Sequence, residues 1–167
     1  MASAFSYNDI NKKDNIIMQE YILTVEKEAV YDEIAKTTSY VGAKKNDPVA
    51  YDNLFTTDED KDILERFWQE SKKTICNTLK RVIVSSEETE EGVFNVTIKL
   101  SSAFPEELLD SMNSSMFSFF VMNISAKWFV ITSKEDAEAY ATYASGHLED
   151  LLRMALYKEA PKRPTYN

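Results

Sequence analysis

The chain has 167 residues, of which 44% are apolar and 12% aromatic, and this composition fits one domain with a hydrophobic core. Nineteen basic and twenty-eight acidic side chains give a net charge of −9, which repels phosphate backbones and anionic lipid surfaces. Specific nucleic-acid binding is therefore not expected. The single Cys76 excludes an internal disulfide, and packing in the core is the preferred interpretation for it.

Residues 1–15 are polar, with closely spaced Asn, Asp and Lys, and predict an extended N-terminal arm. They lack the order of basic and then apolar residues that marks a secretory signal, so the chain is expected to stay in the compartment where it is made. The longest apolar-rich stretch, 108–131, is broken by polar residues, and no membrane span is predicted from it.

Residues 16–158 predict a single domain that is mostly helical. Its first element is a short strand over residues 16–25, with one face made of Ile17, Tyr21, Leu23 and Val25. A helix follows over residues 27–41, because apolar residues recur there at helical separations. Gly42 is the residue best suited to end that helix in a left-handed conformation.

The clearest helix follows Thr57, whose hydroxyl can cap the first turn and is followed by the carboxylates of Asp58 and Asp60. Apolar residues then recur at three- and four-residue spacing and predict one buried face. They are Ile63, Leu64, Phe67, Trp68, Ile75, Leu79 and Val82.

A β-hairpin is predicted over about residues 82–100. Residues 93–100 alternate apolar and polar side chains, and residues 82–84 supply the first strand. The segment between them, residues 85–92, holds four glutamates and predicts a long acidic tip.

Residues 108–131 predict a central helix that is buried on most sides, with Pro105 in its first turn. A last helix starts at the cap residue Ser133 and is stopped by Pro161 and Pro164. The expected fold class is α+β, mostly α: a bundle of about four helices around a central apolar helix, with a projecting β-hairpin and extended termini.

Residue types that carry catalysis are scarce in this chain. The lone His147 is expected to pack or to lie at the surface. Asp58, Asp60 and Asp62 lack the glycine and the glutamate of a calcium loop, so helix capping explains them. The three glycines are too dispersed to form a phosphate-binding turn. We therefore expect a protein that is not an enzyme, with no catalytic residue, metal or cofactor.

Charged residues gather in two places that suit contacts with other proteins, the hairpin tip and the basic extended tail at residues 159–167. Complementary charge of this kind sets the register between subunits. The alternative interpretation is that both runs are simply solvated. The candidate partner-binding residues are Glu87, Glu88, Glu90, Glu91, Lys158, Lys162, Arg163 and Tyr166.

Several segments share a pattern with a known group of proteins. They are residues 35–44, 51–60, 64–68, 116–120, 127–128 and 137–142. They resemble uncharacterised proteins encoded among the structural genes of tailed bacteriophages and prophages. The resemblance covers most of residues 35–158 and implies a neck or head-completion role, in which an adaptor subunit forms a ring between the portal and the tail.

The resemblance also implies partners and a location. The partners are copies of the chain itself, portal components and tail components, and the location is the virion after synthesis in the host cytoplasm. DNA would pass through an acidic ring without being bound. The alternative function is a small-ligand-binding or regulatory domain, with a pocket between the central helix and the hairpin that is lined by Met112, Met116 and Phe120.

Deletion of residues 159–167 is expected to leave folding intact and to weaken assembly, because this tail follows the last predicted helix. Thermal unfolding and size-exclusion chromatography of the truncated chain would measure the two effects. A steep fall in melting temperature would instead make the tail part of the core.

Overall fold

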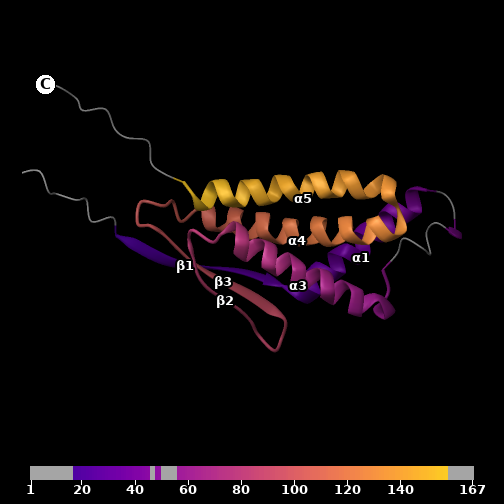
Figure 1. Ribbon diagram of the computed structural model, residues 1–167, viewed down its shortest axis with the longest axis horizontal. Helices are drawn as coiled ribbons and strands as arrows, with labels where there is room; N and C mark the ends of the chain where they lie inside the picture. Colours follow the sequence, from indigo (N-terminus) through magenta and orange to yellow (C-terminus); the bar gives the residue numbers. More distant parts are fainter. Residues whose placement is uncertain (1–16, 46–47, 50–55, 158–167) are drawn as a thin grey trace, which may run out of the picture.

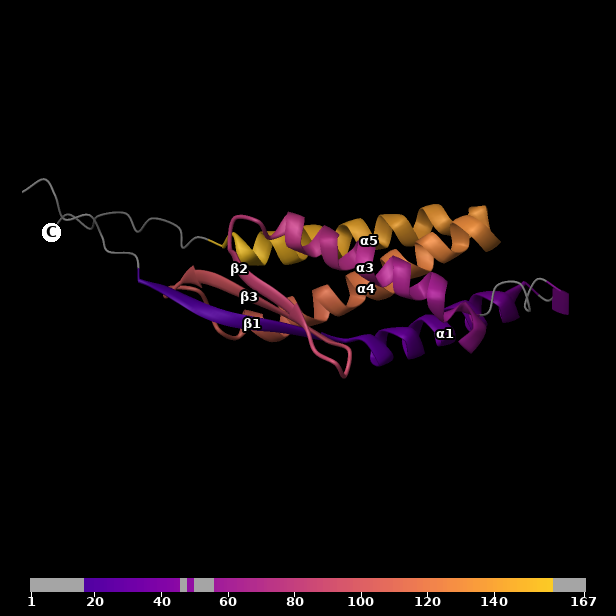
Figure 2. The same ribbon diagram turned by 60° about the horizontal axis from the view of Figure 1, so that its bottom comes forward.

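A three-stranded antiparallel sheet lies against a layer of helices (Figures 1 and 2). The computed structural model describes residues 17–45, 48–49 and 56–157. Its elements are β1 (Met18–Glu26), α1 (Lys27–Lys44), the 3-10 helix η1 (Asp58–Asp60), α3 (Lys61–Thr78), β2 (Ile83–Glu88), β3 (Val93–Ser101), α4 (Leu108–Thr132) and α5 (Lys134–Ala155). The predicted class, α+β and mostly α, is confirmed.

β1 joins the hairpin from a distant part of the chain, because the strand order is β1-β3-β2. β1 pairs with β3 without a break, from Met18 opposite Ser101 to Glu26 opposite Val93. Alternate residues of the two strands face the helices and are buried, as the period of a strand requires. They are Tyr21, Leu23, Val25, Phe94, Val96, Ile98 and Leu100. The predicted strand is confirmed, although Ile17 is exposed rather than part of the buried face.

The hairpin is tighter than predicted. β2 continues through Glu88, and only residues 89–92 turn between the strands (Figure 1). Gly92 has a φ of +80°, which side chains rarely adopt, and its carbonyl accepts a hydrogen bond from the backbone N–H of Lys27 at 2.9 Å. The long acidic tip predicted for residues 85–92 is therefore wrong, because the pairing of β2 with β3 extends along half of that segment.

α4 is the centre of the molecule, as predicted, and contacts α5, α1, α3 and β1. Its buried residues are Met112, Met116, Phe119, Phe120, Val121, Ile124, Ser125, Ala126, Trp128 and Phe129. The rings of Phe120 and Trp68 are centred 4.5 Å apart, and Phe94 packs edge-on against both. Pro105 lies in the turn before α4 and not in its first turn, since the N–H of Leu108 bonds to the carbonyl of Pro105.

By length and composition alone, α4 also meets the criteria for a helix that crosses a membrane. The sequence predicts no membrane span here, and length and composition alone do not test that prediction. The core helix of a folded domain meets the same criteria, and half of the most apolar window of α4 is buried inside this fold. Packing against the other elements accounts for its composition.

α1 runs three residues further than predicted. Gly42 is buried inside the helix, which continues to Lys44 and is followed by Lys45 in a right-handed conformation. The prediction that Gly42 ends the helix in a left-handed conformation is therefore wrong. Side-chain packing around a buried helical position has overridden the local signal of a glycine.

The predicted cap at Thr57 is present, but it opens the 3-10 helix η1, and α3 begins after it at Lys61. α3 also ends earlier than its apolar pattern predicts. The backbone N–H of Thr57 donates to Asp60 Oδ2 at 2.8 Å, and Thr57 and Asp60 form a reciprocal capping box. The helix ends at Thr78, whereas the predicted face continued to Val82. Val82 lies in the turn that leads into β2, and its N–H bonds to the carbonyl of Leu79 at 2.8 Å.

The end of α1 is tied to the start of α5. Ser133 precedes α5, as predicted, but its hydroxyl donates to Asp136 Oδ2 at 2.5 Å instead of capping the backbone. Lys45 Nζ lies 2.8 Å from the same carboxylate. The arm at residues 1–15, the tail at residues 159–167 and both predicted helix-stopping prolines lie outside the described residues.

Replacement of Phe120 by Ala is expected to lower the free energy of unfolding by about 3–5 kcal/mol, because it opens a cavity in a fully buried aromatic cluster. The matched control is Val130→Ala on the same helix, where the side chain is exposed and the change should stay within about 0.5 kcal/mol. Denaturant unfolding measures both. A loss from Phe120→Ala no larger than that of the control would contradict this packing.

Candidate functional site

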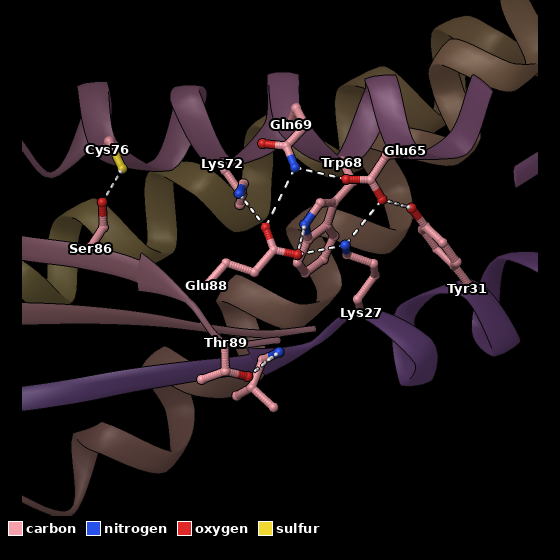
Figure 3. Close-up of polar contacts among 11 residues, drawn as sticks. Lys27, Tyr31, Glu65, Trp68, Gln69, Lys72, Cys76, Ser86, Glu88 and Thr89 are labelled. Carbon is pink, nitrogen blue, oxygen red and sulfur yellow. Dashed lines mark hydrogen bonds and ion pairs between the residues drawn. The ribbon is translucent and has the colours of Figure 1, made fainter. Parts of the chain in front are cut away.

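The densest polar cluster joins the hairpin to α1 and α3, with Glu88 at its centre (Figure 3). Glu88 Oε1 lies 2.5 Å from Lys27 Nζ and accepts a hydrogen bond from Trp68 Nε1 at 3.2 Å. Glu88 Oε2 forms an ion pair with Lys72 and accepts a weaker bond from Gln69 Nε2 at 3.4 Å. One carboxylate at the end of β2 therefore binds the first residue of α1 and three side chains of α3.

A second carboxylate extends the cluster along α3. Glu65 Oε2 lies 3.0 Å from Lys27 Nζ and accepts a hydrogen bond from the Tyr31 hydroxyl at 3.2 Å. Glu65 Oε1 accepts a bond from Gln69 Nε2 at 2.7 Å. Lys27 is thus shared by Glu65 and Glu88, and its ammonium also lies 5.7 Å from the centre of the Trp68 ring.

The electrostatics of this cluster favour its charged form. Burial alone would raise the pKa of Glu88, but hydrogen bonds from Lys27, Lys72 and Trp68 outweigh it and lower that pKa to about 2. The same balance lowers the pKa of Glu65, where Gln69 and Lys27 oppose burial. Burial alone would lower the pKa of Lys27, and its bonds to Glu88 and Glu65 raise it instead.

A general acid or base works best with a pKa near the operating pH. The pKa of Glu88 lies far below neutrality, and those of Glu65 and Lys27 move away from neutrality as well. These groups keep their charges at neutral pH and hold one another in place. The cluster is therefore suited to fastening the hairpin to the helices rather than to proton transfer.

The structure separates the four glutamates predicted as one partner-binding tip. Glu88 is mostly buried and paired within the chain, on the face of the hairpin that meets α3. Glu87 is exposed on the opposite face of β2, and Glu90 and Glu91 are exposed in the turn. Regular alternation from Ile83 would have placed Glu87 rather than Glu88 inside, because the irregular pairing between Ile83 and Ser85 shifts the alternation of β2 by one residue. Lys158, Lys162, Arg163 and Tyr166 lie outside the described residues, so partner binding by them stays a prediction.

Cys76 and His147 are both partly buried. Cys76 is half-buried against the core, and its thiol donates to Ser86 Oγ at 3.4 Å. His147 is half-buried on α5. Among residues 17–45, 48–49 and 56–157, no three His, Cys, Asp or Glu side chains lie close enough together to hold a metal ion.

The pocket predicted beside the central helix is wrong, because Met112, Met116 and Phe120 are all fully buried in the core. An apolar groove of about 470 Å³ lies instead at the end of the sheet where β1 begins and α5 ends. Its lining residues are Met18, Val82, Lys99, Leu100, Ser101, Ala103, Phe104, Ala155, Leu156 and Tyr157. Only the tertiary structure brings these four segments together.

Some of the exposed large apolar side chains belong to segments at opposite ends of the fold, where β1 begins and α5 ends, and where α4 turns into α5. Figure 1 shows these two ends of the fold. At the sheet end, Met18 and Tyr157 are each 45% exposed beside the groove. At the other end, where α4 turns into α5, Val130 is 58% exposed and Ile131 is 59% exposed. α1 ends at the same end of the fold (Figure 1), and Tyr40, near the end of this helix, is exposed. Neighbouring exposed apolar residues are typical of surfaces that bind other molecules.

Comparisons with known proteins find no match from which a class could be assigned. The chain matches no family model, no curated protein and no solved structure. The resemblance to phage structural proteins therefore rests on the sequence segments that carry it.

Replacement of Glu88 by Gln is expected to lower the free energy of unfolding at pH 7 by about 2 kcal/mol, since it removes the charge that Lys27 and Lys72 share. Because folding lowers the pKa of Glu88 from 4.5 to about 2, this stabilisation is present above pH 4.5 and is lost as the pH falls toward 2. Denaturant unfolding across this pH range measures the difference from wild type.

Glu87→Gln is the matched control, because Glu87 is the adjacent glutamate and is exposed. Its effect should stay within about 0.5 kcal/mol at every pH. Equal effects of the two substitutions would show that the ion cluster does not stabilise the fold.

Proposed function

We propose that the protein is a non-enzymatic structural subunit of a tailed-phage particle, a ring-forming adaptor of the neck that links the portal to the tail. The observation that carries the proposal is the pair of exposed apolar regions at opposite ends of one packed core. A subunit that joins two different structures needs two separate contact surfaces, and a ring needs heterologous contacts between its copies.

The distribution of charge supports a role in binding rather than in catalysis. The Glu88 cluster is neutralised by its own lysines, and Lys45 and Lys127 are paired with Asp136 and Glu70. The surplus of acidic side chains gives the whole chain a charge of −9. A ring of such subunits would repel DNA at long range and let it pass through the lumen without being held.

A second candidate function is the binding of a small apolar ligand. The groove of about 470 Å³ at the sheet end favours it, because ligand pockets are commonly of this size and largely apolar. It differs from the pocket predicted beside the central helix in both position and lining. In this case ligand binding would stabilise the chain, and the two apolar ends would have no partners to join.

The test compares charge substitutions at the two ends. Ile131→Lys, at the α4 end, and Tyr157→Lys, at the sheet end, each place a charge in an exposed apolar region. Each is expected to abolish binding to one neighbouring virion protein and to preserve binding to the other, because buried unpaired charge is costly at an interface. Negative-stain microscopy and co-purification with the products of neighbouring genes measure ring formation and partner binding.

Ala141→Lys is the matched control, because Ala141 is exposed on α5 away from both ends. It should assemble like wild type. If the wild-type chain forms no ring and binds none of these proteins, the adaptor proposal fails. Stabilisation of that inert chain by an apolar ligand would then favour the second candidate.

A further inference from the structure

We propose that β1 carries a second binding surface, its free edge, and that in the unassembled protein this edge pairs antiparallel with β1 of a second copy. The pairing would join the two sheets into one across a two-fold axis. It goes beyond the adaptor function and does not rest on it. The partner is defined by backbone geometry and side-chain register.

The backbone of β1 presents an open row of hydrogen-bonding groups. At one end of the strand, the carbonyl of Ile17 accepts from the N–H of Ser102 at 2.8 Å, and at the other, the N–H of Lys27 donates to Gly92 at 2.9 Å. Backbone groups alternate between the two sides of a strand, so the odd-numbered residues bond to β3. The even-numbered residues from Met18 to Glu26 therefore point their N–H and C=O groups to the free edge.

One hydrogen bond within the chain confirms that the even-numbered residues of β1 point to the free edge, and it also occupies one of their donors. The N–H of Thr24 donates to Asn113 Oδ1 of α4 at 2.9 Å, so this even-numbered donor is already occupied. Glu20 and Ile22 have no such partner within the part of the chain that the structure describes. Ile22 is also 62% exposed. β1 has no bulge or proline that would prevent another strand from pairing with its edge.

The other edge of the sheet is protected. β2 has an irregularity in its pairing between Ile83 and Ser85, a feature that discourages strand addition. Side chains of α3 hold β2 through Ser86 and Glu88. Pairing of β1 with β2 of another copy would also bring Glu20 toward the consecutive acids Glu87 and Glu88. The β1 edge of a second copy is therefore the better partner.

Charge selects the register of this pair. Alignment of Glu20 with Glu20 of the second copy would place two carboxylates opposite each other, which is destabilising. A shift of the second copy by two residues instead places Glu20 of each copy opposite Ile22 of the other. This register uses the free N–H and C=O groups of Glu20 and Ile22 and leaves the bond between Thr24 and Asn113 in place.

A two-fold pair has no polarity, so it cannot be the repeating contact of a ring that joins two different structures. We therefore assign it to the free protein, where it would cover an edge that otherwise promotes aggregation. The adaptor proposal can fail while this pairing holds, and the reverse, because the pairing uses backbone groups of the β1 edge and the adaptor contacts use exposed side chains at the two ends.

Sedimentation equilibrium of the full chain is expected to show a reversible dimer. Ile22→Pro removes an edge N–H that is not bonded to β3 and should weaken the dimer at least about tenfold, since two hydrogen bonds are lost across the axis. The matched control is Thr97→Lys on the central strand β3, at the position opposite Ile22. A proline at Thr97 could not serve as the control, because it would break β3. Thr97→Lys should dimerise like wild type.

Amide hydrogen exchange on the wild-type chain gives a second readout that needs no variant. The amides of Glu20 and Ile22 are expected to be protected at concentrations where the dimer forms and to exchange freely on dilution. A chain that stays monomeric at all concentrations overturns the proposal, as does a folded Ile22→Pro variant that dimerises like wild type. Protection of both amides in a monomer would assign the edge to another segment of the same chain and also overturn it.

Discussion

The surface of α4 is apolar around most of its circumference, and the other elements are arranged so that they cover it. α5, α1 and α3 pack along the helix, and β1 covers the part that they leave open. The aromatic contact between Phe120 and Trp68 joins α4 to α3 at 4.5 Å, and Phe94 brings the sheet into the same cluster. Burial of this one helix therefore determines where the sheet and the helices must lie.

The Glu88 cluster attaches the remaining part of the sheet. β2 is short and contributes no residue to the fully buried core, so hydrophobic packing alone holds it weakly. Lys27 and Lys72 fasten its end to the start of α1 and the middle of α3. Because this cluster occupies the charged groups of the hairpin that face the helices, the acidic groups left for partners are Glu87, Glu90 and Glu91 on the outside.

Among the residues that the structure describes, two kinds of surface remain open. The two ends expose apolar side chains such as Met18, Tyr157 and Ile131, which are suited to contacts with other molecules. The edge of β1 exposes backbone groups, which any extended chain can satisfy. An adaptor would use the ends as specific contacts, and it would need the edge covered until assembly, because an open strand edge has little specificity.

Local patterns were enough to predict the class of fold, β1, the capped turn at Thr57, the position where α5 starts, and the central helix, because these signals act over a few residues. They could not show that β1 pairs with β3, since that contact joins Leu23 to Val96, which lie far apart in the sequence. The same limit misplaced Glu88, whose partners come from α1 and α3, and the groove, whose lining comes from several segments. Tertiary packing alone decided which charges are buried and which edge stays open, because both depend on residues that are distant in the chain.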